Sequence, residues 1–454
     1  MLAAFANIFK IPELRNKVLI TLGLVAVFRL GAHLPTPGID GAALAELIRR
    51  LEASQGGSIF SMVSLFSGGA LEQCTIFALG IMPYISASII IQLLQVVIPR
   101  LEKIAREGDA GRKKINQYTR YSTVLLSVIQ AFFISKALEH PERIARIFEG
   151  TVIVPHPGFL FTLTAVLTLT TGTLILMWLG EQITEKGIGN GISLIITGGI
   201  ISRLPAAVQI AWQLFAPGNA QGKSPIYLIL LFGLMVLVVV GIILVTQAER
   251  KIPIQRAQQI RGRKVFQAQN TYLPLRVNYA GVIPVIFASS LLLFPATVGA
   301  MIPDDHFFSF IKVMTNWLAP GEILHNFLYV ILIIFFCYFW TATQFNPIQI
   351  ADDMKRTGAF VPGIRPGKNT AEYLETIMVR ITLAGAIFLA FIALFPSMVS
   401  DYIKIPYIVT QFLGGTGLLI MVGVMLDTMR QVESHLIMRH YDGFMSKTRL
   451  KGRF

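Results

Sequence analysis

The sequence predicts an all-α membrane protein with about ten transmembrane helices. Hydrophobic residues make up 54% of its 454 residues, and charged residues only 14%. A soluble domain of this size needs more surface charge, so lipid must surround much of the chain. A spanning helix needs about 20 apolar residues to cross about 30 Å of hydrocarbon. Such runs are predicted at 18–35, 75–98, 119–138, 158–180, 188–214, 225–247, 279–302, 324–345, 375–398 and 407–428, the fifth being interrupted by Arg203 and Pro205.

The segments between the predicted spans form two alternating sets. One set carries one or two basic residues per segment. The other is rich in Lys and Arg, which marks the cytoplasmic side of a membrane protein, so both termini are expected in the cytoplasm. If the halves 18–214 and 225–428 are repeats, five spans each give them opposite topologies. The basic set consists of an amphipathic N-terminus at 1–17, the loops 99–118, 248–278 and 346–374, and a tail at 429–454.

The sequence lacks a recognisable motif for catalysis or for a cofactor. Gly-Lys-Ser at 222–224 resembles a phosphate-binding loop, but Pro217 stands where that motif needs its first glycine. Cys74 and Cys337 lack the spacing of a metal site, and the histidines fall at span ends, in loops or in the tail. We therefore expect neither an enzyme nor a cofactor. Arg29, inside the first span, is expected to extend toward the outer interface.

Five stretches of the chain carry a family resemblance: FSGGALEQCTIFALGIMPYISASIIIQLLQ at 66–95, WLGEQITEKGIGNGIS at 178–193, GVIPVIFASS at 281–290, FNPIQIADDMKRTGAF at 345–360 and FVPGIRPG at 360–367. They resemble the bacterial SecY family, the central channel subunits of the Sec protein translocase, and the resemblance is collinear from about residue 18 to the tail. It implies a clamshell of two inverted five-helix halves around an hourglass pore. Unfolded secretory proteins would cross the bacterial plasma (inner) membrane through this pore, and transmembrane segments would leave it sideways into lipid.

The resemblance implies a constriction of the pore lined by isoleucine. An apolar constriction can dewet when it is empty and close around a chain when it is full. Two pairs of these isoleucines are spaced i,i+4, so each pair lies on one face of its helix. Spacing alone favours ordinary helix packing, and only the resemblance assigns the ring. Its members are Ile81, Ile85, Ile192, Ile196, Ile286 and Ile420.

The stretch 59–73 is apolar but too short to span the membrane. The resemblance implies that it is a plug in the outer funnel of the closed channel, and its two glycines would let it swing. Its sequence alone fits an interfacial helix equally well. The plug residues are Phe60, Met62, Leu65, Phe66, Gly68 and Gly69.

A side exit, or lateral gate, is implied between the second and seventh spans, with the third and eighth flanking it. A polar cluster of Ser86, Ser88, Gln130 and Asn278 is expected there, and Phe294 is expected to face Ser86. Hydrogen bonds in lipid average only about 0.6 kcal/mol, so an apolar helix could displace them. Polar contacts between permanently packed helices are the alternative.

Basic residues are denser in 248–278 than membrane topology requires, and more follow in 346–374. Such clusters bind phosphate backbones or acidic protein faces. The resemblance implies that these loops bind the ribosome, through ribosomal RNA and protein, and the SecA motor ATPase. Arg365 matches an essential loop arginine of the family, in a turn built from proline and glycine. The docking residues are Arg250, Lys251, Arg256, Arg261, Arg263, Lys264, Arg356, Arg365 and Lys368.

The resemblance also implies SecE-like and SecG-like small membrane subunits, signal sequences, nascent chains and membrane lipids as partners. Two other classes of protein remain open. A secondary transporter would share the number of spans and the inverted repeats, but it would need a polar, ion-binding midplane instead of isoleucines. A scaffold or insertase would lack a continuous pore.

Overall fold

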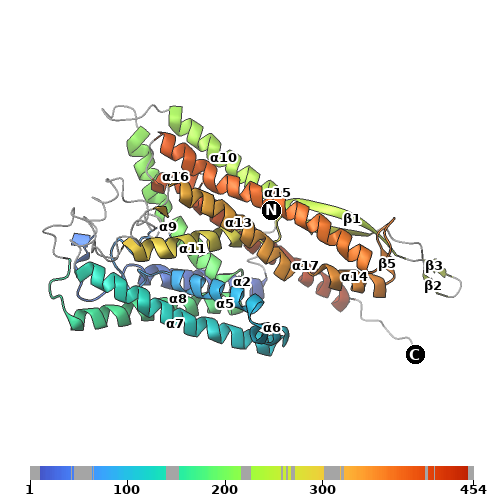
Figure 1. The fold of residues 1–454 in the computed structure, drawn as a ribbon, viewed down its shortest axis with the longest axis horizontal. Helices are drawn as coiled ribbons and strands as arrows, with labels where there is room; N and C mark the ends of the chain where they lie inside the picture. Colours follow the sequence, from blue (N-terminus) through green and yellow to red (C-terminus); the bar gives the residue numbers. More distant parts are fainter. Residues whose placement is uncertain are drawn as a thin grey trace.

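The computed structural model of the chain describes residues 11–41, 43–44, 64, 66–139, 153–215, 226–256, 259–261, 264–266, 271–300, 317–318, 322–403, 407–413 and 415–447. The helices of each half of the chain lie together, the N-terminal group in blue to green and the C-terminal group in light green to red (Figure 1). The N-terminal group consists of α2 (Pro12–Gly31), α5 (Met82–Val97), α6 (Pro99–Arg106), α7 (Asp109–Glu139), α8 (Phe159–Lys186) and α9 (Gly191–Phe215).

The C-terminal group begins after residue 225 and carries the longest helices. It packs against the first group where α5 contacts α11 and where α9 contacts α16 and α17. The group consists of α10 (Ile226–Gln247), α11 (Ile283–Ala300), α13 (Ile323–Gln344), α14 (Pro347–Arg356), α15 (Lys368–Ile403), α16 (Tyr407–Leu413) and α17 (Thr416–Lys447).

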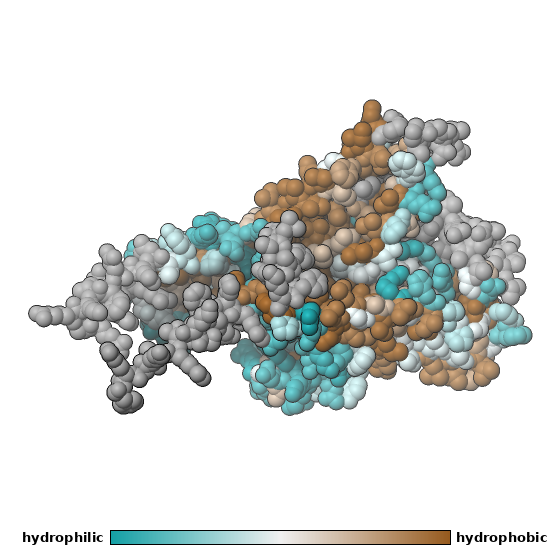
Figure 2. Space-filling view, turned by 180° about the vertical axis from the view of Figure 1, so that it is seen from behind, coloured by the Kyte–Doolittle hydropathy of each residue, from teal (hydrophilic) through white to brown (hydrophobic). Residues whose placement is uncertain are grey.

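Most of these helices suit a lipid environment. Within the described residues, seven helical stretches are long and apolar enough to cross a membrane, and α5 with α6 would make an eighth despite a bend of 101°. With α2 and the shorter apolar α11, each of the ten predicted spans contains a helix. Hydrophobic side chains cover much of the surface in Figure 2, and hydrophilic ones gather toward the end that carries α6 and α14.

Three predicted boundaries differ from the structure. α2 begins at Pro12, within the segment predicted as an N-terminal extension. The tenth span consists of α16 followed by α17, which continues through the predicted tail to Lys447. α9 begins at Gly191, three residues after the predicted start at 188, and it continues through Arg203 and Pro205, where the predicted apolar run is interrupted.

The prediction of one helix over 75–98 is wrong. Residues 68–81 form turns and a single bridge, and α5 begins only at Met82. Pro83 lies in the first turn of α5, where its missing N–H leaves no intrahelical partner unsatisfied. The 16 residues of α5 extend about 24 Å, less than the hydrocarbon thickness of about 30 Å. Non-helical chain therefore makes up the rest of this span.

The loop 248–278 contains a β-hairpin, which the all-α prediction did not include. Its strand β1 (Glu249–Arg256) pairs antiparallel with β4 (Thr271–Arg276). Strands β2 (Gln259–Arg261) and β3 (Lys264–Phe266) lie between β1 and β4 in the sequence and pair with each other.

The two basic loops form one structural unit. The short strand β5 (Ala359–Phe360), from the loop 346–374, pairs with β1 and completes a sheet of order β4-β1-β5. Ile252 and Leu275 of the hairpin are buried in one cluster with Met354 of α14 and Leu374 of α15. The hairpin is thus anchored to the second loop and to α15.

Glycines allow the turns at 68–81 to pack closely against helices. A Cβ on Gly172 of α8 would lie 1.8 Å from the carbonyl oxygen of Ile76. A Cβ on Gly31 of α2 would lie 2.1 Å from the ring of Phe77. Because backbone and ring atoms occupy this space, no larger residue fits without a shift of the turns or of the helix.

We expect Gly172→Ala to destabilise the protein by about 1–3 kcal/mol, the usual effect of overpacking. The measurement is thermal unfolding of the purified protein in detergent. Gly233→Ala is the matched control, because Gly233 is also inside a helix, α10, and a Cβ added there would have nothing within 4 Å. Both changes gain about 1 kcal/mol of helix propensity. Equal unfolding temperatures for the two variants would contradict the close contact with Ile76.

Candidate functional site

The six isoleucines of the predicted ring belong to one hydrophobic cluster formed by both halves of the chain. Five of them are buried, and Ile192 is half-buried against the cluster. Each lies at the start of its helix: Ile81 and Ile85 at α5, Ile192 and Ile196 at α9, Ile286 at α11 and Ile420 at α17.

A cavity of about 740 Å³ opens beside this cluster, with Ile85, Ile192, Ile196 and Ile286 in its wall. The rest of its wall is mostly polar. Arg120 of α7 donates two hydrogen bonds to the carboxylate of Glu181 on α8, with Nε–Oε1 and Nη2–Oε2 distances of 2.9 and 2.6 Å. The other polar residues of the wall include Ser88, Gln92, Asn116, Gln182, Glu185, Asn190 and Ser193.

Two further polar groups of this wall have no hydrogen-bond partner among the described residues. They are the Oε1 of Gln92 and the indole Nε1 of Trp340, both buried. Gln92 lies on α5 and Trp340 on α13, so each half of the chain contributes one buried polar atom that has no partner among the described residues.

A second cavity of about 740 Å³ lies between α5, α6 and α7 on one side and α13 on the other. It shares Tyr84, Ser88, Gln92 and Asn116 with the first cavity. Together the two cavities line the seam where the halves meet. Elsewhere on this seam α5 and α11 are in contact, with the hydroxyl of Ser290 4.0 Å from the sulfur of Met82.

The predicted gate residues form local hydrogen bonds. Ser88 accepts from Gln92 on the same helix at 3.1 Å, and Asn278 donates to the carbonyl of Gly281 at 2.8 Å. Within the described residues, no hydrogen bond joins two of the four predicted cluster members. Ser86 is buried, and Gln130 is half-buried on α7. Phe294 belongs to α11, but its side chain lies outside the described residues.

Part of the predicted plug is described, namely Ser64 and 66–73, here called the plug segment; Phe60, Met62 and Leu65 lie outside the described residues. Gly68 and Gly69 have φ angles of +67° and +88°, in the left-handed region that glycine tolerates. A Cβ on Gly68 would lie 2.8 Å from the Cα of Gly199 on α9. The glycines thus permit a tight turn and a close approach to α9.

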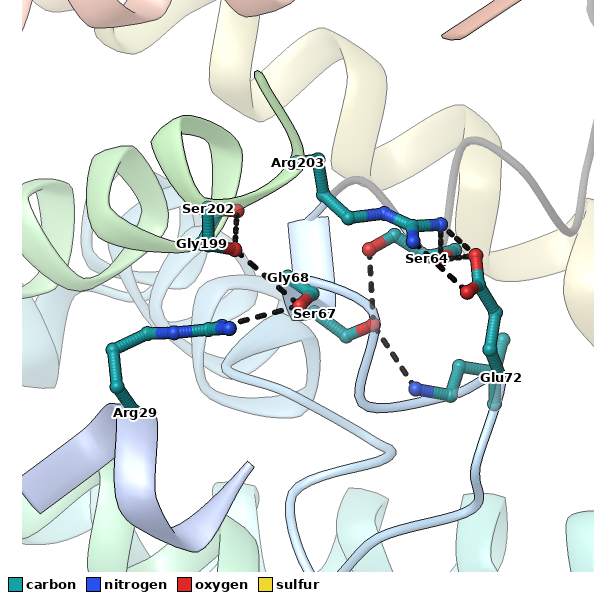
Figure 3. A network of polar contacts seen from close by, with 9 residues as sticks. Arg29, Ser64, Ser67, Gly68, Glu72, Gly199, Ser202 and Arg203 are labelled. Carbon is teal, nitrogen blue, oxygen red and sulfur yellow. Dashed lines mark hydrogen bonds and ion pairs between the residues drawn. The ribbon is translucent and has the colours of Figure 1, made fainter. Parts of the chain in front are cut away.

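Two arginines from flanking helices bind the plug segment (Figure 3). Arg29 of α2 donates to the carbonyl of Gly68 at 3.1 Å. Arg203 of α9 forms an ion pair with Glu72 and donates to the hydroxyl of Ser64 at 2.8 Å. Ser64 in turn donates to Glu72 at 2.7 Å.

Sequence reasoning missed the role of this network. Ionisable residues inside predicted spans were the available signal, because such residues are rare in lipid and usually have a specific partner. Arg203 lies inside the predicted fifth span, and its partner Glu72 lies within a stretch that was assigned only as apolar. Arg120, in the cavity wall, is likewise inside a predicted span.

The docking residues described with their side chains are exposed. These are Arg250 and Lys251 on β1, Arg356 at the end of α14, and Arg365 and Lys368 near the start of α15. Arg256, Arg261 and Lys264 lie in strands with side chains outside the described residues, and Arg263 is outside them entirely.

The turn around Arg365 has the expected glycine geometry. Gly363 and Gly367 have φ angles of +80° and +108°. The hydroxyl of Thr370 donates to the carbonyl of Arg365 at 3.0 Å, which fixes the turn to the first turn of α15. Arg365 is therefore presented to solvent by a defined backbone. In the part of the chain that the structure describes, no group of three or more His, Cys, Asp or Glu residues could hold a metal ion.

Comparisons with known proteins identify the family of the chain. The SecY family model matches residues 75–429. The protein translocase subunit SecY of Escherichia coli (strain K12) is 46% identical over 97% of this chain and 96% of its own length. The protein translocase subunit SecY of Chlamydia muridarum (strain MoPn / Nigg) is also 46% identical, over 100% of both chains.

Solved structures show the same fold at low sequence identity. One described as a protein-conducting channel has a TM-score of 0.61 and 18% identity, covering 96% of this chain and 95% of the other. Sec61 in a canine ribosome–channel complex from the endoplasmic reticulum has a TM-score of 0.57 and 18% identity, with coverage of 96% and 95%. On the sequence matches and this fold, the chain belongs to the SecY family of protein translocase subunits, which are multi-pass membrane proteins.

Proposed function

We propose that the chain forms the pore of a protein translocase, which lets unfolded secretory proteins cross the membrane and lets apolar segments leave sideways into lipid. The order of contacts along α9 carries the proposal. Asn190, Ile192, Ser193 and Ile196 line the polar cavity. Gly199, Ser202 and Arg203, the next turns of the same helix, contact the plug segment. Along α9, the polar cavity is thus followed by the isoleucines of the ring and then by the contacts with the plug segment.

The seal is assigned to the six isoleucines. Ile85, Ile192, Ile196 and Ile286 lie where the polar cavity meets the hydrophobic cluster. β-branched side chains are stiff about χ1, which suits an aperture of defined width. A secondary transporter would instead place its ion-binding groups at this depth.

The side exit is assigned to the seam between α5 and α7 on one side and α11 and α13 on the other. The two cavities along this seam and the thin Met82–Ser290 contact support it. A signal sequence is itself an apolar helix, and it reaches lipid only if two helices part.

The remaining assignments concern orientation and partners. The excess of Lys and Arg supports cytoplasmic termini in a bacterial plasma membrane. The exposed basic residues of the joined loops support docking of the ribosome and of a SecA-type motor. The ribosome-bound Sec61 relative supports the first of these partners. SecE-like and SecG-like subunits would pack on the exposed apolar helix faces.

Replacing Ile81 and Ile286 together with serine is expected to hydrate the seal, because dewetting depends on apolar walls. The channel should then leak ions in a planar bilayer. Ile333→Ser on α13 is the control, since Ile333 is equally buried but outside the ring. A double variant that conducts no more than the control would refute the ring assignment.

Locking the seam should block secretion. A disulfide in the variant carrying Met82→Cys and Ser290→Cys would join α5 to α11 where the two side chains already touch. Oxidation should stop export of signal-bearing proteins, and reduction should restore it, with each single variant as the control. Export at the wild-type rate by a fully crosslinked channel would place the exit elsewhere.

Docking and orientation can be measured with one label. Tyr272 of β4 is 61% exposed, and Cys74 and Cys337 are buried, so Tyr272→Cys offers the reactive thiol. We expect an impermeant reagent to label it only from the cytoplasmic side, and bound ribosome or motor to protect it. Adding Arg365→Glu should weaken this protection, whereas Lys113→Glu, at an exposed position near the start of α7, should not. Labelling from the outer side would overturn the topology, and equal protection in both variants would remove Arg365 from the docking surface.

A further inference from the structure

The ion pair between Arg203 and Glu72 connects two parts of the molecule that must separate if a polypeptide is to pass. Glu72 belongs to the plug segment and Arg203 to α9, and the two are 131 positions apart along the chain. The Nη1 of Arg203 donates to Oε2 of Glu72 at 2.9 Å. The two side chains are only 14% and 23% exposed, so salt and water screen the pair weakly.

The rest of the network holds the pair in place. Ser64 bridges the partners, accepting from Arg203 at 2.8 Å and donating to Glu72 at 2.7 Å. Gly69 lies against Arg203, and a Cβ there would be 3.4 Å from Nη1. The guanidinium is therefore enclosed by the plug segment on more than one side (Figure 3).

The remaining contacts of the segment bind its backbone or are apolar. Arg29 and Ser202 both donate to the carbonyl of Gly68, at 3.1 and 3.4 Å. Phe66 and Ala70 join the central hydrophobic cluster. A carbonyl is present whatever the residue, and apolar contacts form with any hydrophobic surface. Within the described residues, the Arg203–Glu72 pair, with the Ser64 hydroxyl that bridges it, is thus the contact through which the side chains of the segment determine its position on α9.

We infer that the Arg203–Glu72 ion pair is a latch that positions the plug segment on α9 in the resting channel and sets how readily a client displaces it. This inference rests on the proposed channel function. Separation leaves Arg203 inside a membrane-spanning helix without its carboxylate until water enters the funnel, which is unfavourable. A client with a strong signal sequence overcomes this barrier, and one with a weak signal sequence does not.

The test compares variants of the full chain, with its membrane partners, in planar bilayers and in export assays. Glu72→Gln and Arg203→Gln should each raise the resting open probability, and the export of a reporter with a weakened signal sequence, by about tenfold, which corresponds to about 1.4 kcal/mol. The double variant should be no leakier than either single one, because the same interaction is lost. The exchanged pair, Glu72→Arg with Arg203→Glu, should recover much of the wild-type behaviour.

Lys136→Gln is the matched control. It removes one positive charge from an ion pair with Glu139 at the end of α7, and neither residue of that pair is a member of the network. Because Glu72 lies in a turn and not in a helix, Glu72→Gln tests the latch even if the change in α9 impairs folding. The latch is refuted if Glu72→Gln is as tight and as selective as Lys136→Gln, or if the exchanged pair leaks as much as the singles.

A chain lacking residues 60–72 separates this inference from the channel function beneath it. If that chain conducts while the Glu72 and Arg203 variants remain tight, the channel stands and the latch alone fails. If that chain does not conduct, both the proposed channel function and the latch, which rests on it, are refuted.

Discussion

Every backbone N–H and C=O at membrane depth must find its partner inside the protein, and this constraint shapes the centre of the molecule. Helices meet it by themselves, but the turns at 68–81 do not. Those turns are satisfied by one another and by the chain that follows α2: Ile76 donates to the carbonyl of Leu34, and Thr36 donates to that of Cys74. Non-helical chain can lie here only because helices enclose it on several sides.

The composition of the surrounding helices follows from that enclosure. Gly31 and Gly172 leave room for the turns where any side chain would collide, and a Cβ on Gly199 would lie tight against the segment, 3.3 Å from the backbone N of Gly68. Arg29 and Arg203 stand inside helices that face lipid elsewhere, because their partners belong to the enclosed segment. Features that look unfavourable in an isolated helix thus become favourable through one neighbouring segment.

Hydrophobic runs and charge in the sequence predicted the positions of the membrane-spanning helices. The ten apolar runs each contain a helix, and the six isoleucines share one cluster, although their assignment to a ring came from the family resemblance. Hydropathy could not predict backbone conformation. The stretch 75–81 is as hydrophobic as the start of a membrane-spanning helix, and yet it forms turns. Hydropathy also could not show that Arg203 pairs with Glu72, since that contact is set by tertiary packing. The β-hairpin was missed because 248–278 was interpreted through its charge and not through its alternating Ile252 and Ile254.

The pairing of β5 with β1 has a mechanical consequence. Gln255 and Arg256, from one loop, are hydrogen-bonded neighbours of Phe360 and Ala359, from the other. Strand β1 continues from α10, β4 leads toward α11, and β5 leads to α15 through the turn at Arg365. A load applied to the hairpin is therefore shared among three membrane helices, one of which, α11, borders the seam between the halves. A force on either loop would therefore act on these helices as well.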